Sequence, residues 1–139
     1  MEQVAPLALR PTARIDPIPV AWGGLVASIG LMAGSGRDWP LRLAAAALTF
    51  GVGGFLAGVR ADARRPLHAL AAGVAAYVIH ACFVVIARVI DALGGPDAPA
   101  FLPGSGRDAV IAAAWALAAA LVGGLLAHAW LTPAGRSGR

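Results

Sequence analysis

The sequence predicts an all-α integral membrane protein, a four-helix bundle built from two tandem helical hairpins. Only 13% of its 139 residues are charged and 59% are hydrophobic, whereas soluble domains average about 25% charged residues. The mean hydropathy is +0.75, and most charged residues fall between four long apolar stretches. Short motifs in the first half of the chain also recur in the second half. This composition, with a single cysteine, excludes a secreted disulfide scaffold and a disordered chain.

The four apolar stretches predict membrane-spanning helices at residues 18–34, 43–59, 67–90 and 109–131. Crossing a hydrocarbon core takes about 20 helical residues, with about 17 as the lower limit, so the first two segments are marginal. Lipid offers no hydrogen-bond partner to bare backbone, and each segment should therefore be helical. A cleaved signal peptide is the alternative for the first segment. The long proline-rich stretch before it and a poor cleavage site at Ala33-Gly34-Ser35 disfavour that alternative.

The distribution of arginine predicts the orientation of the transmembrane domain, residues 18–131. With four spans, the N-terminal segment 1–17, the loop between the second and third helices and the tail 132–139 share one side. That side holds seven of the eleven arginines, and the four on the other side are matched by four aspartates. Excess Arg is retained in the cytoplasm, so we expect a plasma-membrane protein with both termini cytoplasmic. A nucleic-acid partner is not expected, because the basic residues form no concentrated stripe.

An internal repeat predicts how the helices are grouped. The pentapeptide Gly-Ser-Gly-Arg-Asp at 34–38 recurs at 104–108, and the segment 52–57 matches 122–127 at the same offset. Two hairpins entering from one side form a parallel repeat with a pseudo-twofold axis along the membrane normal. Such an axis would bring Arg37 and Arg107 together as an outer anion site. The alternative is that both side chains simply extend to the interface.

Small residues at spacings of three and four predict the helix-packing faces, because they let backbones approach closely in lipid. The predicted packing glycines are Gly51, Gly54 and Gly58 in the second helix, Gly73 in the third and Gly123 in the fourth. Residues Gly54 and Gly58 form a GxxxG pair. The same faces could form a homodimer. We therefore expect the lipid bilayer and either a homodimer or a heteromeric membrane partner as the partners of this chain.

Three polar residues, His80, Cys82 and Ser28, are predicted to lie inside the membrane. An ionisable side chain at that depth is costly, so His80 is a candidate functional residue. The alternative is a structural role, in which a neutral His80 imidazole is hydrogen-bonded within the bundle. Residues His68 and His80 are about 18 Å apart along one helix, so they cannot share a metal ion. We find no catalytic constellation, paired carboxylates or phosphate loop. The sequence therefore predicts no enzyme, no metal and no cofactor.

The segment 49–77 resembles a broad set of small four-helix bacterial membrane proteins. The resemblance lies in Gly-Gly-Phe-Leu-Ala-Gly at 53–58, the short basic turn that follows, and Leu67-His68 at the start of the next helix. This chain has Ala69 where those proteins usually carry glycine. The resemblance implies four spans and no assigned activity.

These observations together favour a structural or partner-binding membrane subunit. The alternative function is a small homo-oligomeric transporter or channel that uses the pseudo-twofold axis and His80 in the middle of the membrane.

Overall fold

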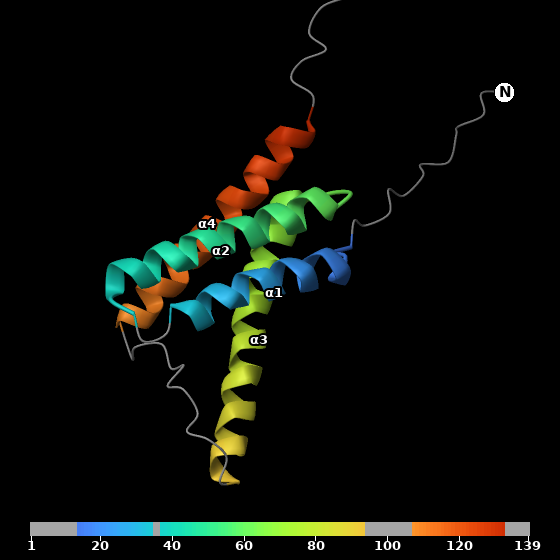
Figure 1. Cartoon of the computed structure of the whole chain (residues 1–139). Helices are drawn as coiled ribbons and strands as arrows, with labels where there is room; N and C mark the ends of the chain where they lie inside the picture. The colour runs from blue at the N-terminus through green and yellow to red at the C-terminus, as the bar shows by residue number, and fades with distance from the viewer. Residues whose placement is uncertain (1–13, 35–36, 94–106, 133–139) are drawn as a thin grey trace, which may run out of the picture.

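The computed structural model describes residues 14–34, 37–93 and 107–132, and this part of the chain is all-helical (Figure 1). It contains α1 (Pro17–Ala33), α2 (Trp39–Arg60), α3 (Arg65–Ala92) and α4 (Arg107–Leu131). The predicted number of helices and their approximate positions are confirmed. The segment 94–106, the predicted outer loop with the second Gly-Ser-Gly, lies outside the described residues, as do 1–13 and 133–139.

Helices α2, α3 and α4 begin two to four residues earlier than hydropathy predicts. Proline stands in the first or second position of α1, α2 and α3, where its missing N–H costs nothing and its fixed φ suits a helix. The N-cap of α1 is Asp16, whose carboxylate accepts a hydrogen bond from the Ile18 N–H at 3.0 Å. The N-cap of α2 is Asp38, in an extended conformation. The charged residue Arg42 thus lies within α2, although in the sequence it marks the N-terminal limit of the second apolar stretch.

Consecutive helices run antiparallel. In α1, Gly30 lies against Thr49 of α2, whereas Gly23, two turns earlier, lies against Gly53. In α4, Gly124 lies against Pro66 at the start of α3, whereas Leu117 lies against Gly73 further along that helix. Helices α1 and α2 are therefore antiparallel, and so are α3 and α4.

The second and fourth helices run parallel. Near the start of both, the Trp115 indole Nε1 donates a hydrogen bond to the Leu43 carbonyl at 3.2 Å. Towards their other ends, Gly58 packs against Ala127. Helices α1 and α3 are parallel as well, because Asp16 contacts His68 and Gly24 contacts Ala75. The two hairpins therefore begin at the same end of the molecule.

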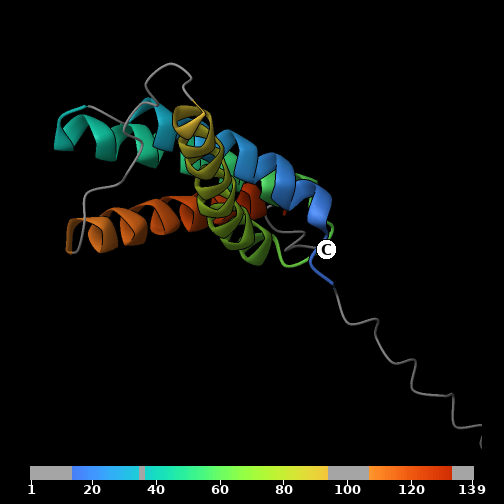
Figure 2. The ribbon, with the colours of Figure 1, turned by 90° about the horizontal axis from the view of Figure 1, so that it is seen from below.

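The third helix crosses α1 and α2 steeply, and its C-terminal half extends beyond the other helices (Figures 1 and 2). Its buried residues all lie between His68 and His80, and none lies in its last twelve residues. The view from below shows α3 obliquely, while α2 and α4 run across it (Figure 2). The described helices thus do not form a bundle of uniformly aligned rods.

The core consists almost entirely of alanine and glycine. Only one large side chain, Phe50, is completely buried among the described residues, and its ring lies 5.5 Å from that of Tyr77. Most large apolar side chains instead point outwards, among them Leu48, Val85 and Trp130. This distribution is the reverse of a soluble core, in which large aliphatic residues are the most buried.

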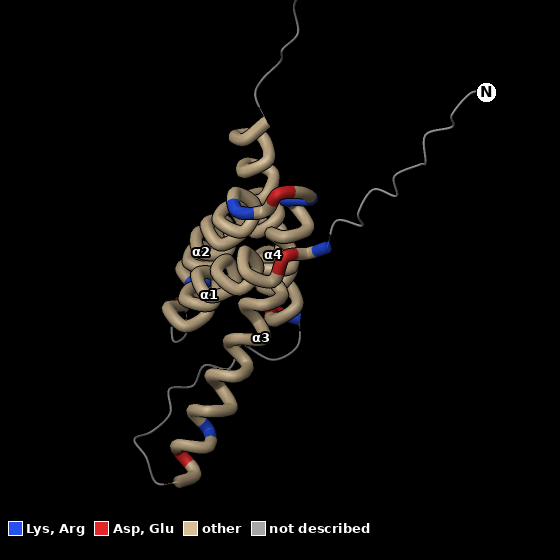
Figure 3. The backbone as a smooth tube through the Cα atoms, turned by 90° about the vertical axis from the view of Figure 1, so that its right-hand side faces the viewer, with Lys and Arg blue, Asp and Glu red and all other residues tan. Residues whose placement is uncertain are grey.

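Three helices, α2, α3 and α4, are long and apolar enough to cross a membrane. Helix α1 is apolar but has only 17 residues, about 26 Å at 1.5 Å per residue. Charged residues lie near the helix ends and in the connections, and the middle of each helix carries none (Figure 3). The described residues are therefore compatible with a membrane protein.

Candidate functional site

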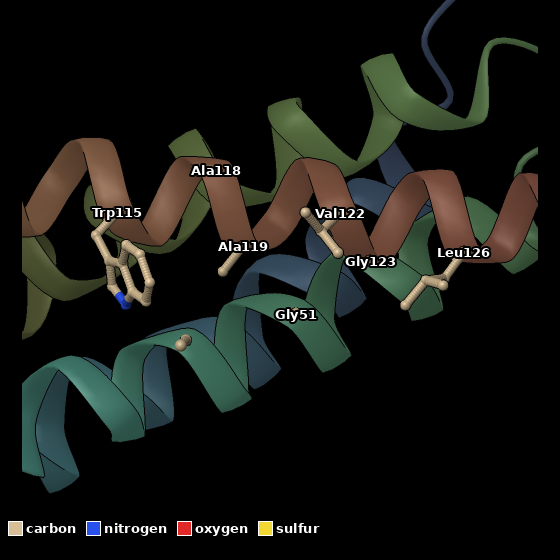
Figure 4. A pocket seen from close by; sticks show the side chains of 8 residues that line it. Gly51, Trp115, Ala118, Ala119, Val122, Gly123 and Leu126 are labelled. Atoms are coloured by element: carbon tan, nitrogen blue, oxygen red, sulfur yellow. The ribbon is translucent and has the colours of Figure 1, made fainter.

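An apolar groove lies between α2 and α4 (Figure 4). We call it the α2–α4 groove; its volume is about 340 Å³ and it is lined by Ala47, Gly51, Trp115, Ala118, Ala119, Val122, Gly123 and Leu126. No lining side chain is charged or has a hydroxyl or amide group. The indole of Trp115, its one polar group, donates to the Leu43 carbonyl. The groove can therefore receive an apolar group, such as a hydrocarbon chain or the side chains of a helix.

The floor of this groove is made by close backbone contact between α2 and α4. A methyl group at Gly54 would collide with the Ala120 carbonyl oxygen, and one at Gly123 would collide with the Gly51 carbonyl oxygen. At Gly58 an added Cβ atom would lie 2.8 Å from the Ala127 Cβ atom. Position 51 differs, since its nearest neighbour would be the Ala119 carbonyl oxygen at 3.8 Å. Three of the four predicted packing glycines in these helices thus exclude a side chain.

Two further contacts between helices involve the predicted Gly73 and two glycines that sequence reasoning did not single out. An added Cβ atom at Gly73 would lie 2.9 Å from the Leu117 Cδ2 atom of α4. In α1, Gly23 faces Ala57 and Ala72, and Gly24 faces Ala75. The two adjacent glycines in the first apolar segment are the sequence signal that could have marked this contact.

The recurring Gly-Gly pairs have different neighbours in the two hairpins. Residue Gly53 faces α1 of its own hairpin, whereas its counterpart Gly123 faces α2 of the other hairpin. Residue Gly54 faces α4 of the other hairpin, whereas its counterpart Gly124 faces α3 of its own. Helix directions agree with a parallel repeat, but these corresponding glycines do not have equivalent surroundings.

The three polar residues predicted to lie inside the membrane, His80, Cys82 and Ser28, differ in burial: His80 and Ser28 are buried and Cys82 is exposed. Residue His80 is 7% exposed at the middle of α3, and Ser28 is buried in α1. The Ser28 hydroxyl donates to the Leu25 carbonyl of its own helix at 2.8 Å. The thiol of Cys82 is free and exposed. Within the described ranges, no three His, Cys, Asp or Glu residues gather closely enough to hold a metal ion.

The buried residue His68, which the sequence analysis placed at the start of the third helix without a partner, joins the starts of α1 and α3. His68 is 3% exposed; its Nε2 atom accepts a hydrogen bond from the Asp16 N–H at 2.9 Å, and its Nδ1 atom lies 3.3 Å from the Arg64 carbonyl oxygen. This pattern assigns the proton to Nδ1, in a neutral imidazole that donates to Arg64. Arg64 itself has a positive φ of 51°. The ring thus connects the cap of one helix to the cap of another.

Arginine side chains gather near the same end of the molecule as His68. The Arg60 guanidinium lies 5.7 Å from the centre of the exposed Trp22 ring, a cation–π contact between α2 and α1. At the other end, Arg37 and Arg107 are both exposed, at the start of α2 and of α4 respectively. Their pairing as an outer anion site stays a prediction.

Comparison with protein-family models, curated proteins and solved structures finds no match for this chain.

Proposed function

We propose that this chain is a multi-pass membrane protein that binds a partner within the bilayer, as a structural or partner-binding subunit. The observation that carries the proposal is the α2–α4 groove, which is apolar, made of small residues and left open by the chain's own helices. In lipid, small residues are what allow a second helix to approach closely. A groove of this kind suits a transmembrane partner better than a polar substrate.

The outer surface supports the membrane part of the proposal. Large apolar side chains on all four helices are exposed, including Ile18, Leu48, Val74 and Leu126. Water-soluble monomers rarely expose continuous apolar surface on this scale. We propose that α1 crosses together with α2, α3 and α4, and that a modest local thinning of the bilayer accommodates its 17 residues.

The parallel directions of α2 with α4 and of α1 with α3 support two tandem hairpins that enter from one side. Arginine is in excess at the start of α1 and in the connection between α2 and α3, where Arg14, Arg60, Arg64 and Arg65 lie. This excess supports a plasma-membrane protein with both termini in the cytoplasm.

Site-specific photo-crosslinking tests the partner role. A photoreactive residue at Ala118, on the rim of the groove, should form adducts with one defined membrane protein, which mass spectrometry of the purified adduct identifies. The same residue at Ile29, exposed on α1, is the control. Equal labelling from both positions, or adducts with lipid alone, would contradict a specific partner at the groove.

Topology is tested in a Cys82→Ala background. A cysteine at Ser105 should react with a membrane-impermeant maleimide from outside the cell, and one at Asp62 only after the inner face is opened. The reverse pattern would overturn the orientation, and reaction of both cysteines only after the inner face is opened would argue against a chain that crosses the membrane between them.

A small transporter or channel is the second candidate function. The burial of His80 halfway along α3 favours it, since an ionisable residue at such a depth can relay protons. Proton flux into proteoliposomes that is lost in the His80→Ala variant would support transport. A groove-specific adduct without flux would support the partner role.

A further inference from the structure

Arginine is concentrated where α2 ends and α3 begins. The six residues 60–65 contain Arg60, Arg64 and Arg65 but only one carboxylate, Asp62, so this segment has two more positive than negative charges. In Figure 3 blue segments lie on either side of a red one at this connection. We call residues 60–65 the basic turn.

The two ends of the basic turn lie next to each other against α4. An added Cβ atom at Gly58 would lie 3.3 Å from the Gly124 Cα atom, and one at Gly124 would lie 3.4 Å from the Arg65 carbonyl oxygen. The last turn of α2 and the first turn of α3 are therefore adjacent at Gly124. The start of α1 lies close to the start of α3, because the Asp16 N–H donates to His68. Long arginine side chains from both ends of the turn can thus reach one ligand.

The arginines of the basic turn have no carboxylate partner within residues 14–34, 37–93 and 107–132. The Arg60 guanidinium lies over the Trp22 ring instead. The Asp16 carboxylate, near the start of α3, accepts the Ile18 N–H in its own helix cap. Residue Asp62 makes no ion pair in this part of the chain either. An anion from outside the chain would therefore neutralise charge that the described residues leave uncompensated.

The side chain of Arg65 is partly buried, whereas Arg60 and Arg64 are exposed. Its Nε atom is buried without a hydrogen-bond partner among the described residues. The two terminal nitrogens of this guanidinium are not buried in the same way, so they can donate to a ligand at the surface. A partly buried charge without a counter-charge is unfavourable. An anion bound at these terminal nitrogens would offset that cost.

The start of α3 lacks the negative group that usually stabilises a helix N-terminus. Its N-cap residue is Arg64, which makes no side-chain capping bond, and its first turn contains no acidic residue. Asp, Asn, Ser or Thr is preferred at an N-cap, and negative charge is favourable beside it. The first N–H groups of α3 and the arginine side chains around them therefore favour the same kind of ligand, an anion.

We propose that the basic turn binds a phosphate group. A guanidinium can pair with two phosphate oxygens at once, which suits arginine to this ligand. The expected source is the headgroup of an anionic phospholipid, because Trp22 beside Arg60 is 54% exposed, and tryptophan and arginine are both typical of a membrane interface. Free phosphate has the same chemistry. Only the lipid source rests on the proposed function, and the phosphate site itself does not.

Native mass spectrometry of the full chain tests the site. The probe is an equimolar mixture of phosphatidylglycerol and phosphatidylcholine, added to the purified chain in a neutral detergent. The wild type should retain phosphatidylglycerol in preference to phosphatidylcholine. Arg60→Gln combined with Arg64→Gln should lower this retention about tenfold, because it removes charge-assisted hydrogen bonds. The charge-matched control combines Arg37→Gln with Arg88→Gln, both exposed outside the basic turn, and should retain as much as the wild type.

Thermal melting gives a second measurement and assigns the source of the phosphate. A ligand that binds only the folded chain raises its melting temperature. Phosphatidylglycerol should raise the melting temperature of the wild type and of the control variant more than that of the basic-turn variant. If inorganic phosphate has the same effect and displaces the lipid, the ligand is free phosphate; if the lipid stays bound in excess phosphate, the ligand is the headgroup. Helical circular dichroism checks that both double variants fold.

The outcomes separate this inference from the proposed function. Equal retention of the two lipids with no effect of inorganic phosphate, or equal loss of phosphatidylglycerol in the two double variants, overturns the phosphate site and leaves the partner role intact. A chain that retains phosphatidylglycerol at the basic turn but forms no specific adduct at the groove overturns the partner role alone. A chain that does not enter membranes, but melts at a higher temperature with inorganic phosphate, overturns the membrane role alone.

Discussion

At the scale of single residues, the close packing of these helices depends on glycines, which have no side chain. Glycines 54, 58 and 123 bring α2 and α4 so close that an added methyl group meets backbone or another Cβ atom. At neighbouring Gly51, which lines the groove, an added Cβ atom would make only an ordinary contact of 3.8 Å with the Ala119 carbonyl oxygen. The same residue type in the same helix therefore has two roles, and the two positions make a matched pair for mutation.

We expect Gly54→Ala to destabilise the protein and Gly51→Ala to be neutral or slightly stabilising. Alanine favours a helix interior by about 1 kcal/mol over glycine at both positions. At position 54 the collision with the Ala120 carbonyl adds an overpacking cost of about 1–3 kcal/mol. Thermal melting of each purified variant in the same detergent measures the difference. Equal melting temperatures would show that α2 and α4 are not held together at Gly54.

We expect His68→Ala to loosen the start of α1. The substitution removes the acceptor of the Asp16 N–H and the donor to the Arg64 carbonyl, at a cost of about 1–3 kcal/mol for buried groups left unpaired. Hydrogen exchange of the first-turn amides of α1 should become faster, while the exposed His128→Ala leaves it unchanged. Unchanged protection in His68→Ala would mean that the imidazole does not hold this helix end.

At the scale of helices, the parallel contact of α2 with α4 joins the two hairpins. It is anchored by the indole of Trp115 near the start of both helices and by Gly58 near their ends. The steep crossing of α3 has the opposite effect, because it packs only half of its length. The longest helix of the described chain is therefore buried only between His68 and His80, and its last twelve residues are not.

The parallel direction predicts which cysteine pairs can be bridged. With Cys82 replaced by alanine, Leu43→Cys and Trp115→Cys should be joined within one chain by a short bis-maleimide, because the Trp115 ring reaches the Leu43 carbonyl. The combination of Leu43→Cys with Leu126→Cys should not be joined, since these residues lie towards opposite ends of the helices. A gel-shift assay after protease cleavage between the helices measures both. Efficient bridging of Leu43→Cys with Leu126→Cys would show that α4 runs antiparallel to α2.

At the scale of the whole molecule, the sequence was sufficient for the number of helices and insufficient for their arrangement. Hydropathy locates apolar stretches, so the helices lie near the predicted positions, but it cannot extend α2 past Arg42 to its N-cap Asp38. The predicted packing glycines lie between helices because close approach requires small residues. The steep crossing of α3 depends on side chains meeting in three dimensions, and His68 lies at a helix end, where no periodic pattern marks a polar contact.

We expect the two hairpins to associate when they are expressed as separate chains. A break after Asp62 leaves α1 and α2 in one fragment and α3 and α4 in the other, and the glycine contacts of α2 with α4 and of α1 with α3 cross that break. The tagged first fragment should therefore co-purify with the second in mild detergent. Gly123→Leu in the second fragment should abolish co-purification, because its side chain collides with the Gly51 carbonyl. Recovery of each fragment alone would show that the connection between α2 and α3 is required.

The hydrogen bond from Asp16 to His68 also sets an order for biosynthesis. The two residues are 52 positions apart, so a ribosome adding about 5–20 residues per second needs roughly 3–10 s after making the first to supply the second. During that interval the first helix has no imidazole to accept the Asp16 N–H. The hydrogen bond that joins the starts of the first and third helices therefore forms only after the beginning of the third helix has been synthesised.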